Sequence, residues 1–455
     1  MKKFVTKAEA NKYLNELGNE FTIIQNPSYI HPNYEVIPLA PKLAKPSKKI
    51  VAVVMDMDGT TTTTEELCIH SLEFMVRKIS GRITKSEWAG LDHQKDYPHI
   101  IGNSTTKHVE YLIRKYQSTI KLNELKSSYI FAALWTILIG KDDNRKEEVK
   151  NNLFSLGCSA LLSNRRFVDL QKIKTTESKL KSSLKYFIEK YAHHLEIDSM
   201  SKFVRAGIDI YYQRYHEILL EITQGKSEKL AAELLGDKNK HLIEPLPGVG
   251  IFLALTKGLL GPESGKLSKL LIQHYHIKNP LAKDQFNYIA VEKQLLKLSK
   301  SFTTNPLKIA VVTSSIFYEA NIVLSEVFRI LKDEVRHWNI SSTRKRNILN
   351  KFENYQIFYD GFVTASDSNE IRLKPHRDLY SIALQKLAIS KKDFDKVIGF
   401  EDSESGTISI RAAGIGHCVA VPFTKTEGHN LEAATYLSKG GLPEVILKKN
   451  LFIEQ

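Results

Sequence analysis

Two carboxylates stand two residues apart directly after a continuous apolar run. Asp56 and Asp58 follow the run at residues 50–55, and Gly59 and Thr60 come next. In an α/β sheet, ligands bind beyond the carboxyl ends of the strands, so both acids would lie at the mouth of a site. One carboxylate there can attack phosphorus as a nucleophile, and the other can protonate the leaving group. Gly59 allows a close turn that exposes backbone amides to a phosphate, although two solvated acids in an ordinary turn are the alternative.

Polar side chains also follow other predicted strands. Thr313 and Ser314 follow an apolar run, and their hydroxyls and amides suit a phosphate oxygen. Lys374 lies in the segment KPHRDLY, where it could neutralise both a phosphate and a nucleophile. Glu401 and Asp402 end another apolar run, and paired carboxylates at a strand end suit Mg²⁺. Taken singly, each segment also fits an ordinary structural role: a turn, a helix start near a proline, or a solvated acidic turn.

Strands and helices must alternate to bring these side chains together. Strand-like apolar runs lie at residues 50–55, 308–312, 361–363, 397–400 and 417–421, with helical patterns between them, such as 378–387 and 407–413. The first run is continuously apolar and largely β-branched, which is typical of a strand buried on both faces of a parallel sheet. The alternation predicts an α/β domain of the Rossmann-like, doubly wound kind.

The remaining patterns indicate how the chain is organised. Residues 66–242 show apolar positions at three- and four-residue spacing, which predicts a large all-helical domain inserted after the first core strand. The α/β core would then comprise residues 49–65 and 243–455, with a smaller, mostly helical insertion at about 250–306. Residues 1–48 predict a short helix and then a connector whose prolines make regular structure improbable.

Together, these segments resemble the haloacid dehalogenase (HAD) superfamily of phosphotransferases. The matching motifs occur in the family's order: DxDGT at 56–60, PGV at 247–249, a strand-terminal Thr313, Lys374 in KPxxDxY, and EDSxxG at 401–406. The resemblance covers about residues 49–65, 243–255 and 307–447 and is closest to the β-phosphoglucomutase-like branch. The helical insertion occupies the place of the family's cap domain. One departure is Thr61–Thr64, where the family commonly has an apolar residue and an aspartate.

The resemblance implies a role for each matching residue that handles the phosphate. Asp56 would be the nucleophile that becomes phosphorylated, and Asp58 the general acid and base. Thr313 would bind the phosphate through its hydroxyl. Ser314 and Gly59 would contribute backbone donors beside it.

The same resemblance implies a magnesium site and a catalytic lysine. Lys374 would orient the nucleophile and the phosphate. Asp402 would bind Mg²⁺ together with Asp56 and the backbone carbonyl of Asp58, and Glu401 would be a second acidic contributor. The metal would screen the repulsion between an anionic nucleophile and an anionic phosphate.

The resulting prediction is a Mg²⁺-dependent phosphatase that hydrolyses a small phosphorylated metabolite, such as a sugar phosphate. A phosphomutase of the β-phosphoglucomutase type is the nearest alternative. The acid at Asp58 argues against a carbon–halogen hydrolase, because dehalogenases of the family lack it.

Composition and charge suggest an alternative function, that of a binding protein instead of an enzyme. The 455 residues include 65 Lys and Arg against 51 Asp and Glu, a formal net charge of +14. With basic stretches at 164–166 and 344–346, this charge would suit a nucleic-acid or acidic-partner binding protein on a vestigial hydrolase scaffold. Filled catalytic positions favour the enzyme instead, and the charge would then steer anionic substrates toward the site. We therefore expect no nucleic acid as a partner.

The sequence also bears on location. Only three widely spaced cysteines occur, which excludes a disulfide framework. Charged residues interrupt the first twenty positions, and no apolar run approaches the roughly 18 residues of a membrane span. We expect a cytoplasmic protein with no membrane partner, and the sequence carries no signal of oligomeric state.

Overall fold

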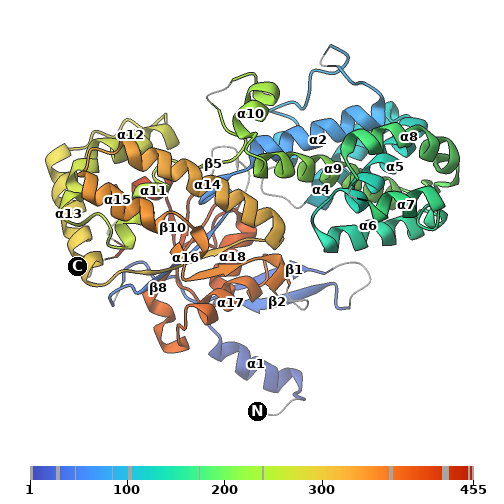
Figure 1. The fold of residues 1–455 in the computed structure, drawn as a ribbon. Coiled ribbons are helices and arrows are strands. Elements are labelled where there is room, and N and C mark those ends of the chain that lie inside the picture. The colour runs from blue at the N-terminus through green and yellow to red at the C-terminus, as the bar shows by residue number, and fades with distance from the viewer. Residues whose placement is uncertain are drawn as a thin grey trace. The chain divides into compact units, whose positions relative to one another are not determined.

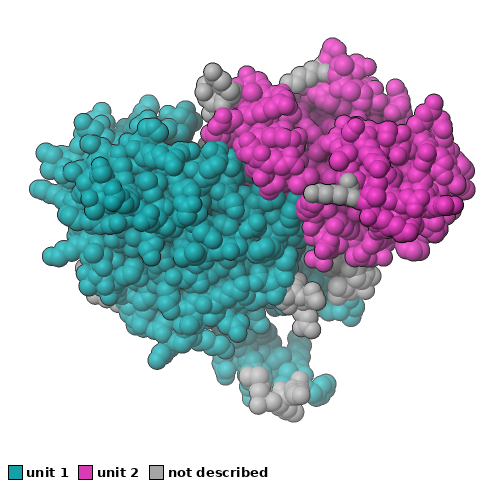
Figure 2. Space-filling view, viewed as in Figure 1, with its two compact units in different colours: residues 1–63, 243–455 teal, residues 64–242 magenta. Residues whose placement is uncertain are grey.

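The computed structural model divides the chain into two compact units. It describes residues 4–26, 31–46, 48–84, 86–100, 105–173, 175–237, 240–367, 372–422, 430–448 and 451–452. One unit comprises residues 1–63 and 243–455, and the other comprises residues 64–242 (Figure 2). The first unit contains a parallel sheet and the second contains helices (Figure 1).

A six-stranded sheet forms the centre of the first unit. Its strands are β3 (Ala52–Asp56), β6 (Lys308–Val312), β7 (Gly361–Val363), β8 (Val397–Glu401), β9 (His417–Ala420) and β10 (Tyr436–Leu437). All neighbours pair in parallel, in the order β10-β9-β8-β3-β6-β7. The chain moves outward from β3 to β6 and β7, then returns to build β8, β9 and β10 on the other side. The predicted doubly wound α/β fold is confirmed, and its direction reverses at β3, where ligands bind in such sheets.

Helices cover both faces of this sheet. All five residues of β3 are buried, which explains its continuous apolar sequence. On one face, Val54 and Val312 pack with Leu379 of α17 (Asp378–Lys386) and Ile410 of α18 (Glu404–Ala412). On the other face, a ring of α11 (Val249–Thr256) meets β8 edge to face, since the Phe252 and Phe400 centroids lie 5.4 Å apart. Both faces of β3 therefore lie in an apolar core.

The other helices of this unit lie before, between and after the strands of the sheet in the sequence. They are α1 (Lys7–Glu16), α12 (Ser268–Lys278), α13 (Tyr288–Thr304), α14 (Phe317–His337), α15 (Ser342–Lys351), α16 (Tyr355–Phe358) and α19 (Gly441–Leu447). Residues 250–306 thus contain α12, α13 and nearly all of α11.

The prediction of an irregular connector after the first helix was wrong. Strands β1 (Phe21–Gln25) and β2 (Tyr34–Pro38) form an antiparallel hairpin there, with Ile23 opposite Val36. Proline is tolerated in edge strands and at strand ends, where no ladder hydrogen bond depends on its missing N–H. Ile24 is buried, and just after the hairpin the Ala40 amide donates to the Arg411 carbonyl at 3.0 Å.

The described residues of the second unit form helices and connecting loops, with no strand among them. Its helices are α2 (Glu65–Ser80), α3 (Tyr97–Ile100), α4 (Thr105–Tyr116), α5 (Leu122–Leu138), α6 (Asp143–Ser155), α7 (Arg165–Lys172), α8 (Glu177–Tyr191), α9 (Met200–Thr223) and α10 (Ser227–Leu235). Helices α2, α5 and α9 pack against one another. The chain enters and leaves this unit beside an antiparallel pair, β4 (Thr62–Thr63) and β5 (Glu244–Pro245). None of the described helices combines the length and the hydropathy that crossing a bilayer requires.

Candidate active site

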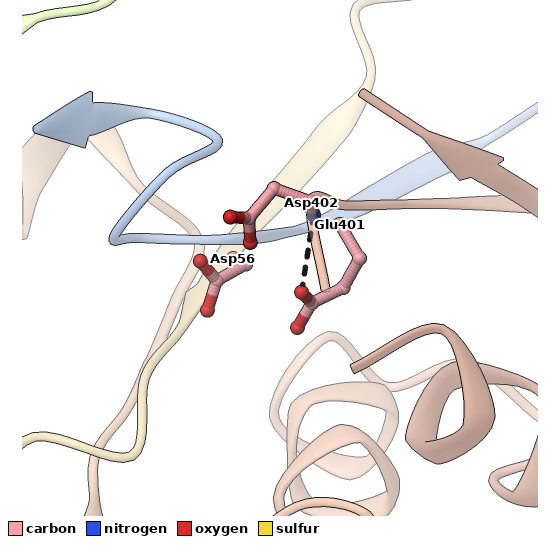
Figure 3. A group of neighbouring side chains, drawn as sticks. All are labelled: Asp56, Glu401 and Asp402. Carbon is pink, nitrogen blue, oxygen red and sulfur yellow. Dashed lines mark hydrogen bonds between the residues drawn. The ribbon is translucent and has the colours of Figure 1, made fainter. Parts of the chain in front are cut away.

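Three carboxylates meet at the carboxyl ends of β3 and β8. Asp56 is the last residue of β3, Glu401 is the last residue of β8, and Asp402 follows it. Met55 pairs in register with Phe400, so the next residues on the two strands lie beside each other. One oxygen from each carboxylate lies within 4.8 Å of the others, and all three residues are buried. Figure 3 shows the Asp402 carboxylate directed toward Asp56.

Lys374 places a positive charge among these acids. Its Nζ contacts Asp56 Oδ1 and lies 2.6 Å from Glu401 Oε1, and its side chain is 8% exposed. Burial alone would lower the pKa of Lys374, but the charges of Asp56 and Glu401 raise the pKa above its ordinary value. The lysine therefore carries its charge at neutral pH and bridges two strand ends.

One ammonium does not balance this many carboxylates. Burial raises the pKa of Asp56 well above its ordinary range, and the negative charges of Glu401, Asp402 and Asp58 add to the effect while Lys374 opposes it. Burial and the Glu401 charge likewise raise the pKa of Asp402 to about 8. A hard divalent cation would relieve this repulsion, and carboxylate oxygens are the donors that Mg²⁺ prefers. The donor set therefore fits Mg²⁺.

Glu401 differs from its two neighbours because protein donors already occupy both of its oxygens. Oε1 accepts from Lys374 at 2.6 Å and from the Tyr380 hydroxyl at 2.7 Å. Oε2 accepts from the Asp402 backbone amide at 3.2 Å and from Ser403 Oγ at 3.1 Å. A carboxylate offers about four acceptor positions, and these four donors use them. The geometry favours Glu401 as the residue that holds Lys374 in place.

A turn after β3 brings a further acid beside hydroxyls that follow β6. Thr313 is 1% exposed, and its amide donates to the Val363 carbonyl at 2.9 Å. Thr313 Oγ1 and Ser315 Oγ each lie 3.5 Å from Asp58 Oδ2. Ser314, between them, is exposed. This loop therefore places two hydroxyls beside Asp58.

Gly59 brings the backbone against the metal-binding candidates. Its φ of +82° lies in the left-handed region that favours glycine. A Cβ at this position would overlap the Asp402 carboxylate. The amide of Gly59 donates to the Thr62 carbonyl at 2.7 Å, which closes the turn. Glycine is required here by both conformation and space.

The structure thus gathers the predicted site residues at one edge of the sheet. Gly59 joins the group through its backbone alone, and its amide, predicted as a donor to phosphate, donates to the Thr62 carbonyl instead. Ser314 is exposed. Three participants were not predicted as site residues: Ser315, Tyr380 and Ser403. Each lies within a motif that the sequence shows, but only the fold reveals that Tyr380 and Ser403 reach Glu401.

Comparisons with known proteins add little to these observations. No protein-family model matches the chain, and no curated protein matches it. Among solved structures, CbbY from Rhodobacter sphaeroides in complex with phosphate is 13% identical, with a TM-score of 0.35 over 88% of this chain and 99% of that chain. A putative β-phosphoglucomutase from Thermotoga maritima is 15% identical, with a TM-score of 0.31, and the match covers 88% of this chain and 97% of that chain. The β-phosphoglucomutase from Clostridium difficile is 12% identical, with a TM-score of 0.32, and the match covers 86% of this chain and 90% of that chain. Because these TM-scores lie below 0.5, the function is inferred from this chain's own residues.

Proposed function

We propose that the protein is a Mg²⁺-dependent phosphatase of the HAD type that hydrolyses a small phosphorylated metabolite. The observation that carries the proposal is the buried Asp56 carboxylate at the point where the sheet reverses direction, in contact with Lys374 and beside Asp402. A carboxylate held between a fixed ammonium and a second acid suits nucleophilic attack on a phosphoryl group.

Asp56 and Asp402 are the side chains that would hold the metal, and the backbone carbonyl of Asp58 would join them by resemblance to the family. When bound, Mg²⁺ supplies positive charge that screens the anionic phosphate from the anionic nucleophile. Glu401 would contribute by fixing Lys374, because its oxygens already have protein donors.

Asp56 and the residues around it would carry out the steps of the reaction. Asp56 Oδ attacks phosphorus and forms an aspartyl-phosphate while the leaving oxygen departs. Asp58 protonates that oxygen and later takes a proton from the water that hydrolyses the acyl-phosphate. Thr313 and the amides of its loop would bind the phosphate oxygens, and Lys374 would neutralise charge on the nucleophile and the phosphoryl group.

The helical unit, residues 64–242, would serve as the cap that selects substrate and excludes water. The net charge of +14 would favour anionic substrates through long-range attraction.

The proposal is tested with the purified full chain and a panel of phosphate monoesters, including sugar phosphates. We expect Mg²⁺-dependent phosphate release that EDTA and Asp56→Asn both abolish. Asp393→Asn, which changes a partly exposed aspartate that accepts a hydrogen bond from Lys396, is the matched control and should leave turnover intact. Turnover that persists in Asp56→Asn would contradict the mechanism, and release that requires a bisphosphate activator would favour a mutase.

A further inference from the structure

A hollow on the helical unit has a different chemistry from the carboxylate cluster. It has a volume of about 590 Å³ and lies between the start of α7 and the end of α8. We call it the Asn164 hollow, after the residue at its base, and its polar lining includes Arg165, Arg166, Tyr186 and Lys190. Asn164 and Arg165 belong to a basic stretch that the proposed phosphatase mechanism does not use.

Positive charge dominates the lining. Arg165, Arg166 and Lys190 face a single acid, Asp169. Among the described residues, none of the three cations has a carboxylate within ion-pair distance. Arg166 lies over the Tyr186 ring, with its guanidinium carbon 4.5 Å from the centroid, and Lys190 Nζ lies 5.7 Å from the same ring. The tyrosine therefore positions two of the cations.

Asn164 fixes the direction of two phenol hydroxyls. Its Oδ1 accepts from the backbone amides of Arg166 at 2.9 Å and Phe167 at 3.3 Å, which caps α7. Its Nδ2 donates to the hydroxyls of Tyr186 at 3.1 Å and Tyr191 at 2.8 Å. Asn164 and Tyr191 are 9% and 4% exposed, so this arrangement is built into the unit. Because both phenol oxygens act as acceptors toward Asn164, their own hydrogens are left to donate in other directions.

Lys190 reinforces this polarity. Its Nζ donates to the Tyr186 hydroxyl at 3.4 Å. The hydrogen bonds from Asn164 and Lys190 lower the pKa of Tyr186. The hollow thus presents guanidinium, ammonium and phenol donors with one carboxylate, so its complement is an anion with several acceptor oxygens.

We propose that the Asn164 hollow binds a small phosphate-bearing anion. Arginine presents a planar fork of donors that matches phosphate oxygens, and the volume falls in the range of small-molecule sites. A single-stranded nucleic acid fits less well, because such sites stack bases on aromatic faces and Arg166 and Lys190 already lie over Tyr186. This inference does not depend on the proposed phosphatase activity.

The test uses the full chain and inorganic pyrophosphate as the probe, in buffer with EDTA. Without metal, the carboxylate cluster of the other unit repels the probe, so binding there does not interfere. We expect saturable binding by calorimetry and slower hydrogen exchange in residues 164–172. Arg165→Gln with Arg166→Gln should weaken binding by at least about tenfold, the equivalent of one lost charged contact.

Two further double variants distinguish binding by specific donors of the hollow from non-specific attraction by the positive charge of the protein. Tyr186→Phe with Tyr191→Phe keeps the net charge and the rings, and it should weaken binding because two donors are lost. Lys179→Gln with Lys185→Gln removes two exposed charges of α8 that do not line the hollow, and it should leave affinity unchanged.

Three results would overturn the inference. The first is that the protein does not bind pyrophosphate. The second is that the double arginine variant and the double lysine variant weaken pyrophosphate binding equally. The third is that the double tyrosine variant binds pyrophosphate with full affinity. Protection of residues 164–172 by a single-stranded oligonucleotide but not by pyrophosphate would overturn it in favour of a nucleic-acid surface.

Discussion

Replacing Lys374 with methionine removes the ammonium that contacts both Asp56 and Glu401 while keeping a side chain of similar length. The change leaves Asp56, Glu401 and Asp402 buried, with their oxygens within 4.8 Å of one another. It therefore converts a partly balanced cluster into three acids without a bridging cation. We expect both a loss of stability and a change in its dependence on pH.

The magnitude follows from the burial of the pair. Removing one partner of a buried ion pair costs about 3–5 kcal/mol, because the other charge stays buried without compensation. The sign of the pH effect follows from Asp56 and Asp402, whose pKa values are raised, the latter to about 8. The folded protein binds more protons than the unfolded chain below that pH, so stability falls as pH rises from about 4 to 8. In Lys374→Met this fall becomes steeper, and the destabilisation is larger at pH 8 than at pH 5.

The assay is urea unfolding of the metal-free protein at pH 5 and pH 8, with hydrogen exchange of residues 52–56 reporting on the sheet. Lys396→Met is the matched control, because Lys396 makes a 2.6 Å ion pair with Asp393 that is more exposed. Its loss should cost much less than the loss of Lys374 at either pH, because ion pairs near the surface contribute little to stability. The double variant Lys374→Met with Glu401→Gln should be less destabilised than the sum of the single variants. Equal costs for the Lys374 and Lys396 variants, or a Lys374 cost that does not change with pH, would refute the reasoning.

Two further predictions concern the metal. Mg²⁺ should raise the free energy of unfolding more at pH 8 than at pH 5, because at pH 5 it must displace the proton that Asp402 holds through its raised pKa of about 8. Thermal unfolding with and without Mg²⁺ measures this difference. An equal effect at both pH values would count against a metal on Asp402. Asp402→Asn should weaken Mg²⁺ binding, measured by calorimetry, by at least about tenfold. Glu401→Gln should weaken Mg²⁺ binding less but should impair turnover, since Glu401 holds Lys374. A larger loss of Mg²⁺ affinity in Glu401→Gln than in Asp402→Asn would make Glu401 the principal ligand.

Much of the fold could be predicted because buried parallel strands leave a direct pattern. The apolar run before Asp56 and the VIGF run before Glu401 are continuous because both faces of these strands are buried. The hairpin at residues 21–38 could not be predicted in the same way. Its strands are short, consist mostly of exposed and partly buried residues, and contain one buried residue, Ile24. The prolines around them argue against a strand in the sequence, although a proline at a strand end disrupts no ladder hydrogen bond.

The site could be predicted only as a set of residues, with their contacts left open. The parallel sheet makes it physically reasonable that side chains after β3, β6 and β8 meet, because carboxyl ends share one edge. No sequence spacing reveals that Tyr380 donates to Glu401, since that contact depends on how α17 packs on the sheet. The catalytic and metal-binding roles stay predictions.

The central claim is that Asp56 carries a phosphoryl group during turnover. The direct measurement is rapid acid quenching of the full chain during turnover of its best substrate with Mg²⁺, followed by peptide mass spectrometry. We predict one added phosphoryl group on the peptide that contains Asp56, and its loss in Asp56→Asn. A phosphoryl group on another residue, or phosphate release that continues in Asp56→Asn, would contradict the account.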